Sequence, residues 1–262
     1  HRGVIVQHAS ALLISDLHLT PSMPLTAQRF FDFCEKDASQ VEAVFILGDL
    51  FEYWIGDDAT SHSPFVQEVK RALANLSAKT KTYYMHGNRD FLVGPDFIKK
   101  TGMTLLPDPS LVSIGGEQYL LAHGDALCTD DLAYQSFRNW TRRPWVQKAF
   151  LSLPLKWRRA IAHHLRSNSH AQYHAKTNSE QQAKMDVTTK ACSAILLNHQ
   201  CNKLIHGHTH LPGHHSEHLG NHEWQRWVLS DWDLDRPTGS RPRANTLFIN
   251  AQGVHPIDLI RA

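Results

Sequence analysis

The sequence has few cysteines, and no two of them have the spacing of a metal-binding or redox motif. Its four cysteines, Cys34, Cys128, Cys192 and Cys201, lie far apart in a chain of 262 residues. Without a C-x-x-C pair, this pattern is typical of reduced thiols in a cytosolic protein rather than of a disulfide framework. Any metal site is therefore expected to use ligands other than cysteine.

Long apolar runs are also missing. The apolar runs are short, such as residues 43–47, and none approaches the ~20 residues that a membrane-spanning helix needs. The first residues contain no long apolar stretch, so we expect no signal peptide. A hydrophobic fraction of 42% and a charged fraction of 20% are ordinary for a globular protein and exclude a fibre or a disordered tail.

Acidic residues are absent from one long segment. Between Leu132 and Ser179 the sequence has no Asp or Glu, although it has nine Lys or Arg. The same segment contains three of the seven tryptophans, Trp140, Trp145 and Trp157. All 25 acidic residues lie elsewhere in the chain. The net charge of +2 is therefore the sum of a basic segment and a net acidic remainder. A basic segment with tryptophans is typical of a surface that meets a phosphate substrate, a membrane or nucleic acid.

Outside that segment, apolar runs typical of strands alternate with helical patterns. Strands are predicted at residues 11–15, 43–47, 82–86, 118–122, 203–206, 224–229, 246–249 and 254–259. Helices are predicted at residues 26–38, 65–77 and 186–198. Because strands that alternate with helices form βαβ units, the predicted fold class is α/β. Residues 132–184 are helical by pattern, interrupted by Pro144 and Pro154, and we interpret them as a helical cap inserted into a single domain of residues 1–262.

Five short polar motifs directly follow apolar strands. They are Asp16-Leu17-His18, Gly48-Asp49, Gly87-Asn88-Arg89-Asp90, His123-Gly124-Asp125 and Gly207-His208-Thr209-His210. In α/β sheets, binding sites form at the carboxyl ends of strands. Each motif alone is a weak signal, because Asp-x-His and His-x-His also occur in structural positions. Their shared position at strand ends predicts one common site.

The residue types in these motifs suit a metal centre. Asp, Asn and His supply carboxylate, amide and imidazole donors, which favour a hard or borderline cation. An Asp at the end of a central strand can bridge two cations with its two oxygens. Two cations ~3.5–4 Å apart activate a water and hold a phosphoryl group during in-line displacement. We therefore expect phosphoryl chemistry at these strand ends.

In this order, the motifs resemble those of the calcineurin-like metallophosphoesterases over nearly the whole chain. Longer blocks resemble one branch of that family, which cleaves the pyrophosphate bond of a UDP-linked diacyl glucosamine lipid in bacterial lipid A synthesis. These blocks are residues 15–19 (SDLHL), 46–52 (ILGDLFE), 54–58 (WIGDD), 86–92 (HGNRDFL) and 123–131 (HGDALCTDD).

The resemblance implies both a fold and a set of ligands. The implied fold has two facing β-sheets flanked by helices, with a helical cap over the site. The resemblance assigns seven ligands to two Mn²⁺ ions that share Asp49: Asp16, His18, Asp49 and His210 hold the first ion, and Asp49, Asn88, His123 and His208 hold the second.

Arg89 is a departure from the general family pattern. Many members have His after the Asn, where it protonates the leaving group. Attack of water on the α-phosphorus of a UDP-sugar lipid releases UMP and a sugar 1-phosphate, a good leaving group that hardly needs a proton. An Arg that stabilises pyrophosphate charge is more useful there, so Arg89 favours a diphosphate substrate. The alternative is a surface Arg that pairs with Asp90.

The resemblance also implies which residues act on the substrate. The implied catalytic residues are Asp49, Asn88, Arg89 and His123. The implied substrate contacts are Asn88, Arg89, Asp131, Ser169, Tyr173, Lys176 and His208, although the family often has Asn where this chain has Tyr173.

The basic cap fits a charged lipid substrate. Its Lys and Arg side chains can meet a diphosphate and the anionic cytoplasmic face of the bacterial inner membrane, so we expect a peripheral, monomeric enzyme. We expect half of its large apolar residues to contact acyl chains or the membrane interface and half to pack on the core. These residues are Trp140, Trp145, Phe150, Leu151, Leu153, Leu155, Trp157 and Ile161.

Three other functions remain open. A general phosphodiesterase or nucleotide phosphatase of the same fold would need no apolar cap. A binding module with a vestigial metal site should have lost ligands, and this chain has all of them. Nucleic-acid binding by the basic segment lacks a recognisable module, so we expect no nucleic-acid partner.

Several further residues are given secondary roles. We expect His86 and His206 to orient the ligands from behind. Asp57 and Asp58 are expected either to cap a helix or to bind substrate. An exposed loop is expected to carry four histidines: His214, His215, His218 and His222.

Overall fold

Two six-stranded sheets form the centre of the protein, which is described from a computed structural model. The structure describes residues 6–175, 186–235 and 241–260, and the side chains of residues 166–175 are outside this description. The first sheet has the order β1 (Val6–His8), β6 (Ser110–Ile114), β7 (Glu117–Ala122), β8 (Lys203–His206), β10 (His222–Val228) and β9 (Gly213–Leu219). The second has the order β12 (Gly253–Asp258), β11 (Asn245–Asn250), β2 (Ala11–Ile14), β3 (Ala43–Ile46), β4 (Lys81–Met85) and β5 (Thr104–Leu106).

The two sheets face each other across a shared core. In the second sheet, β2, β3, β4 and β5 run parallel, and alternate residues point to opposite faces. Leu13 and Phe45 face the first sheet, where they pack with Tyr119 and Ile205. Strands buried on both faces need apolar residues at every position, which explains why these strands are near-continuous apolar runs.

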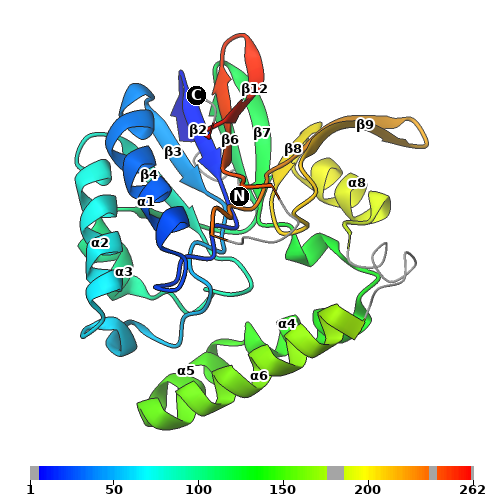
Figure 1. The fold of residues 1–262 in the computed structure, drawn as a ribbon. Coiled ribbons are helices and arrows are strands. Elements are labelled where there is room, and N and C mark those ends of the chain that lie inside the picture. Colours follow the sequence, from blue (N-terminus) through cyan, green and yellow to red (C-terminus); the bar gives the residue numbers. More distant parts are fainter. Residues whose placement is uncertain (1–5, 176–185, 236–240, 261–262) are drawn as a thin grey trace.

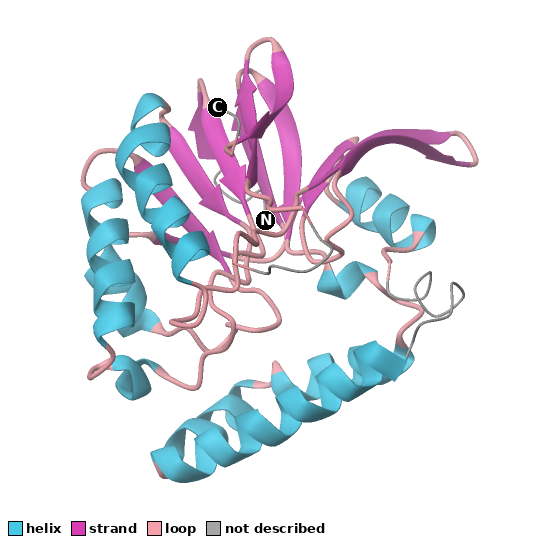
Figure 2. Ribbon diagram, in the orientation of Figure 1, coloured by secondary structure: helices cyan, strands magenta, loops and turns pink. Residues whose placement is uncertain are grey.

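Helices cover the outer faces of both sheets (Figure 2). The second sheet is covered by α1 (Pro24–Asp32), α2 (Pro64–Ser77) and α3 (Pro95–Thr101), and α8 (Thr189–Asn198) packs on the first. The helix predicted at 26–38 is shorter than expected, because the α-helix ends at Asp32 and the chain continues as a π-helical turn over Phe33–Asp37. The four cysteines are free and buried, as expected of reduced thiols.

Three further helices lie across the loops at the carboxyl ends of the strands (Figure 1). They are α4 (Leu132–Thr141), α5 (Pro144–Ser152) and α6 (Leu155–Ala175), and we call them the cap. Pro144 begins α5 and Pro154 precedes α6, as proline favours the first turn of a helix and disrupts its interior. Within the described ranges, no helix is both long and apolar enough to cross a bilayer.

The cap exposes more apolar surface than the sequence predicted. None of the eight large apolar residues expected to divide between core and surface is buried. Trp140, Trp145 and Trp157 are 52%, 60% and 58% exposed. The expectation that half of these residues pack on the core was wrong: three are half-buried and five are exposed, because α4 and α6 are held to the body by hydrogen bonds and ion pairs.

The four histidines expected on an exposed loop lie instead on the β9–β10 hairpin. His214, His215 and His218 are in β9, and His222 begins β10. The edge strand β9 is exposed on both faces, so its sequence lacks the apolar alternation from which a strand is predicted. The ring of His214 stacks on the buried hairpin residue Trp227, with ring centroids 4.5 Å apart.

Candidate active site

The predicted ligands all lie on loops that leave the carboxyl ends of strands. Asp16 and His18 follow β2, Asp49 follows β3, Asn88 follows β4, His123 follows β7, and His208 and His210 follow β8. These five strands belong to both sheets, and their ends converge on the side that the cap covers (Figure 1). The position at strand ends therefore brings the motifs to one place.

The backbone at this place has an unusual conformation. Among the described residues, six other than glycine have positive φ, and five of these six are predicted ligands: Asp16, His18, Asp49, His208 and His210. Their φ values lie between 49° and 68°, in the left-handed region that side chains with a Cβ rarely adopt. Such conformations cost free energy and concentrate at functional sites, where the surrounding structure fixes them.

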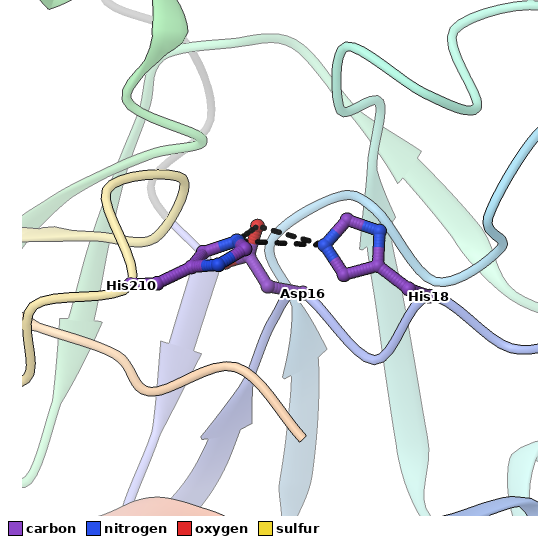
Figure 3. Close-up of side chains that lie close together, drawn as sticks. All are labelled: Asp16, His18 and His210. Carbon is purple, nitrogen blue, oxygen red and sulfur yellow. Dashed lines mark hydrogen bonds and ion pairs between the residues drawn. The ribbon is translucent and has the colours of Figure 1, made fainter. Parts of the chain in front are cut away.

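Asp16, His18 and His210 form a first group of possible ligands (Figure 3). Nε2 of His210 lies 3.3 Å and Nε2 of His18 lies 4.0 Å from Oδ1 of Asp16. Oδ1 is buried and has no hydrogen-bond partner among the described residues. An unsatisfied buried carboxylate oxygen is costly, and a cation between it and the two imidazoles would satisfy it.

Asp49, His123 and His208 form a second group, and Asn88 completes it. Oδ1 of Asn88 lies 3.0 Å from Nε2 of His123 and 3.0 Å from Nδ1 of His208. The other nitrogen of His123, Nδ1, donates a hydrogen bond of 2.8 Å to the carbonyl of Leu47. When Nδ1 carries the proton of the neutral ring, Nε2 is the nitrogen whose lone pair can bind a cation.

Asp49 stands between the two groups. Its Oδ2 lies 3.9 Å from Nε2 of His18 and 3.8 Å from Nε2 of His123. Its Oδ1 accepts a hydrogen bond of 2.8 Å from the backbone N–H of Arg89, which fixes the carboxylate plane. One carboxylate oxygen therefore faces donors of both groups, as a residue that bridges two cations must.

Two glycines allow the loops to approach the ligands this closely. A Cβ on Gly87 would lie 2.0 Å from Oδ1 of Asp49, and a Cβ on Gly207 would lie 2.4 Å from Oδ2 of Asp16. Both distances are far below van der Waals contact, so any side chain at these positions would displace a carboxylate. The glycines of the motifs are therefore required by close packing against the ligands.

Burial is the largest influence on the pKa values at the site. It lowers the pKa of His18 to about 3 and that of His208 to about 4, so both imidazoles are neutral, as metal ligands must be. It raises the pKa of Asp49 to about 7, and other buried carboxylates add to the rise. Burial opposes a charge on His123, but the carboxylates around it, led by Asp49, raise its pKa to about 9. The site concentrates negative charge that a cation would neutralise.

Asp90 organises the loops behind the ligands, a role that the sequence did not reveal. The side chain is fully buried and accepts hydrogen bonds from the backbone N–H groups of Gly87 (2.9 Å), Asp49 (3.2 Å) and Leu50 (2.8 Å). The alternative that Arg89 is a surface Arg paired with Asp90 is therefore wrong. Nη1 of Arg89 lies instead 3.6 Å from Oε1 of Glu52.

Two outer carboxylates face the first group and were also missed. Glu52 lies 3.4 Å from Nδ1 of His18, and Asp231 lies 3.7 Å from Nδ1 of His210. Asp231 is in turn held by Arg243, whose Nε donates a hydrogen bond of 2.7 Å. Carboxylates behind ligating histidines orient the rings and raise their basicity. Asp231 lies shortly after β10, so it shares the position at a strand end that predicted the motifs of the site.

His86 and His206 contact loops of the site rather than the ligand side chains. His86 Nε2 donates a hydrogen bond of 2.7 Å to the carbonyl of Val93. His206 Nδ1 donates one of 2.8 Å to the carbonyl of Gly207, next to His208. His206 thus supports the loop that carries His208, whereas His86 supports the loop that leads to α3.

The implied substrate contacts on the cap are only partly described. Asp131 caps α4, where its Oδ1 accepts a hydrogen bond of 3.0 Å from the N–H of Tyr134. Ser169 and Tyr173 lie in α6, but their side chains are outside the described part of the chain. Lys176 lies outside the described residues altogether.

Asp57 and Asp58 have different roles. Asp57 accepts hydrogen bonds from the N–H groups of Gly94 (2.9 Å) and Phe97 (3.0 Å), so it caps α3 rather than a helix of its own segment. Asp58 forms a two-pronged ion pair with Arg158 of α6. It therefore attaches the cap to the body.

Comparison with known proteins agrees with this geometry. The sequence profile described as calcineurin-like phosphoesterase matches residues 10–212. A UDP-2,3-diacylglucosamine hydrolase of Ralstonia nicotianae is 45% identical over 249 residues, which cover 92% of this chain and 91% of the relative. A protein of the same name from Pseudomonas putida is 44% identical, over 92% of this chain and 95% of the relative. Among solved structures, a Vps29 of Entamoeba histolytica complexed with zinc aligns over 95% of this chain and 99% of its own, at 13% identity and a TM-score of 0.41, too low to carry an inference.

The profile covers more than half of the chain, and the relatives match it over nearly their whole length. Two facing sheets, helices on their outer faces and ligands at the strand ends agree with that match. The chain belongs to the calcineurin-like phosphoesterase family.

Proposed function

We propose that this chain is a UDP-2,3-diacylglucosamine hydrolase. It hydrolyses the pyrophosphate bond of the lipid by attack of water on the α-phosphorus, and the products are UMP and 2,3-diacylglucosamine 1-phosphate. One observation carries the proposal: relatives of that name are 44–45% identical over about nine tenths of both chains. Both ligand groups are complete in this chain, which is what hydrolysis by a metal-dependent phosphoesterase requires.

Two divalent cations fit the site, and we propose Mn²⁺ for both. Asp16, His18, Asp49 and His210 would hold the first ion, and Asp49, Asn88, His123 and His208 the second. The donor set of carboxylate, amide and imidazole favours a hard or borderline ion, and the unsatisfied Oδ1 of Asp16 gives one a direct partner. When bound, the ions supply Lewis-acid polarisation of the phosphoryl oxygens and a water of lowered pKa.

The side chains around the ions position the diphosphate. Arg89 is 30% exposed at the edge of the site, with Glu52 beside its guanidinium. From there it can donate two parallel hydrogen bonds to phosphate oxygens and stabilise the negative charge that develops on them. Oδ1 of Asn88 and Nε2 of His123 lie 3.0 Å apart, so both atoms are placed to hold the second ion, against which the phosphoryl group would lie.

The cap is proposed to receive the lipid part of the substrate. An apolar cavity of about 520 Å³ lies between α3 and α5, lined in part by Phe91, Val93, Ile98 and Leu151. Phe91 and His86, which line it, belong to the same loop segment as Asn88 and Arg89, so we propose that acyl chains enter the cavity while the diphosphate stays at the proposed ligands. Asp131, Ser169, Tyr173 and Lys176 are proposed to contact the head group.

We also propose that the cap rests on the anionic cytoplasmic face of the bacterial inner membrane. Its exposed tryptophans are suited to a membrane interface, and the same helices have no acidic residue. Some of its basic residues serve another purpose, since Arg138, Arg142 and Arg158 bind groups of the body. Lys148, Lys156 and Arg159 are exposed and can meet lipid phosphates.

A general phosphodiesterase of the same fold is the less favoured reading. Such an enzyme would need neither the exposed apolar cap nor the cavity between α3 and α5. A binding module without activity is less favoured as well, because all seven proposed ligands are present and grouped.

Hydrolysis in ¹⁸O-labelled water tests the proposal. The purified protein with Mn²⁺ should convert UDP-2,3-diacylglucosamine into UMP and the lipid monophosphate, with ¹⁸O appearing in UMP because the α-phosphorus is attacked. Mass spectrometry of both products gives the result. Intact lipid substrate together with rapid cleavage of small phosphodiesters would overturn the proposal, and ¹⁸O in the sugar phosphate would overturn the site of attack.

A further inference from the structure

One face of α4 is directed at the loops of the site. Tyr134, Arg138 and Arg142 are spaced by four residues, so they lie in a row along the helix. The side chains of all three are partly buried, whereas Trp140, on another face of the same helix, is 52% exposed. Helix α4 therefore contacts the body through a polar row.

The partner of this row is Asp125, a fully buried carboxylate of the body. Its Oδ2 accepts a hydrogen bond of 2.6 Å from the hydroxyl of Tyr134 and one of 2.8 Å from Nε of Arg138. Nη2 of Arg142 lies 3.7 Å from the same oxygen. A charge-assisted contact of this kind, shielded from water, is much stronger than an exposed ion pair.

The same row also touches the two loops that carry the second group of ligands. The ring of Tyr134 stacks on the ring of His208, with centroids 6.1 Å apart and planes at 27°. Nη2 of Arg142 donates a hydrogen bond of 2.8 Å to the carbonyl of Gly87, the residue before Asn88. Asp125 thus fixes the position of helix α4, and α4 contacts both His208 and the loop that carries Asn88.

We propose that Asp125 is a positioning residue that seats α4 and thereby fixes the orientation of His208 and Asn88 in the second ligand group. This proposal rests on the ligand set of the proposed function. Asp125 contacts neither the proposed ions nor the substrate, and it acts through Tyr134 and Arg142. The attachment of the cap to Asp125 and the geometry of the second ligand group are therefore coupled. Loss of the contact with Asp125 lowers the affinity of this group for its ion.

The other attachment of the cap provides a matched control. Arg158 of α6 donates to both carboxylate oxygens of Asp58 and gives a hydrogen bond of 2.7 Å to the carbonyl of Ile55. Asp58 also joins the cap to the body by an ion pair, but none of its contacts reaches a ligand loop. Asp58→Asn therefore weakens the cap attachment without touching the row on α4.

The test measures Mn²⁺ binding to the full-length protein without substrate. Free Mn²⁺ is followed by electron paramagnetic resonance for wild type, Asp125→Asn, Arg138→Met and Asp58→Asn, with circular dichroism as the check on folding. Asp125→Asn and Arg138→Met should weaken the second ion roughly 10-fold, the low end of the range for residues behind a ligand, and Asp58→Asn should leave it unchanged. Tyr134→Phe keeps the ring on His208, so its loss should be smaller than that of Asp125→Asn.

Two results would overturn the proposal. One is wild-type Mn²⁺ affinity in both single variants, Arg138→Met and Asp125→Asn. If Asp125→Asn does not fold, wild-type affinity in Arg138→Met alone has the same meaning. The other is an equal loss in Asp58→Asn, which would mean that any loosening of the cap has the same effect. Because no substrate is present, these outcomes are independent of whether the wild-type protein cleaves UDP-2,3-diacylglucosamine, which the ¹⁸O experiment decides.

Discussion

The carboxylate of Glu52 lies 3.4 Å from Nδ1 of His18, on the opposite edge of the ring from Nε2, the atom that faces Asp16 and Asp49. A carboxylate in this place puts negative charge behind the imidazole and raises its basicity as a metal ligand. The same Glu52 faces Arg89, so one acidic side chain supports both a proposed metal ligand and a proposed phosphate-binding residue.

Replacing Glu52 by Gln should weaken the first ion. The amide keeps the size of the side chain but loses the charge that raises the basicity of His18, so Mn²⁺ affinity should fall roughly 10- to 100-fold. Glu42→Gln is the control, since Glu42 lies 3.8 Å from Nδ1 of His8 on β1 and directly precedes β3, at the other end of that strand from Asp49. Isothermal titration with Mn²⁺ measures the effect, and equal affinities for both variants would contradict it.

Asp49→Asn should remove the bridge between the two ions. A neutral amide cannot share negative charge between two cations, so fewer than two Mn²⁺ should remain bound, and kcat/KM should fall on the order of 10³-fold, about 4 kcal/mol. Elemental analysis gives the metal content and product formation gives the rate. Asp96→Asn, which alters an exposed residue paired with Lys100, should change neither. Undiminished turnover in Asp49→Asn would favour a binding module over an enzyme.

Arg89→Ala should act on the diphosphate substrate more than on a simple ester. Loss of the guanidinium removes two charge-assisted hydrogen bonds to the pyrophosphate, so kcat/KM for the lipid should fall roughly 10²–10³-fold. Cleavage of an aryl phosphodiester, which has no second phosphate, should fall much less. Arg71→Ala, at an exposed position of α2, is the control. Equal losses on both substrates would mean that Arg89 is a general electrostatic residue.

The exposed tryptophans of the cap should control binding to membranes. The triple variant Trp140→Ser, Trp145→Ser and Trp157→Ser should lose most of its binding to anionic vesicles, because these side chains are more than half exposed and suited to the interface. Flotation with anionic and zwitterionic vesicles at two salt concentrations measures it. Leu197→Ser with Leu219→Ser removes exposed apolar residues from α8 and β9 and should have little effect.

The ion pair between Asp58 and Arg158 should depend on acid pH. The hydrogen bond from Arg158 holds the pKa of Asp58 below its ordinary value of 3.8. A lowered pKa in the folded state contributes stability that is present above pH 3.8 and lost as the pH falls through the lower value. Because Asp58 is 65% exposed, the contribution is at most about 1 kcal/mol. Wild type and Asp58→Asn should therefore differ in urea denaturation at pH 7 and converge as the pH falls well below 3.8.

The five motifs that carry the seven proposed ligands were predictable because the signal for a strand end is local. Each follows a short apolar run, and the end of a parallel strand determines where the next residues point. Asp90 and Asp125 were not predictable in this way, since each acts through backbone or side-chain groups that only folding brings near. Asp90, for example, reaches across 40 residues to the N–H of Leu50.

For the cap, the helices were predictable from the sequence, but the exposure of their side chains was not. Its helices and their breaks at Pro144 and Pro154 follow from the sequence, because proline acts on its own turn. Which side of each helix is covered depends on the partner surface, and here that surface is polar. Apolar residues such as Trp140 and Trp145 therefore remain at the surface, although residues of this type are common in a core.

The left-handed backbone at five proposed ligands has a consequence for the rate of metal uptake. Loops fixed by Asp90 and by close glycine contacts hold Asp16 and Asp49 in their strained conformations before any ion arrives. An incoming cation then meets donors that need little rearrangement, so association should be limited by loss of water from the ion.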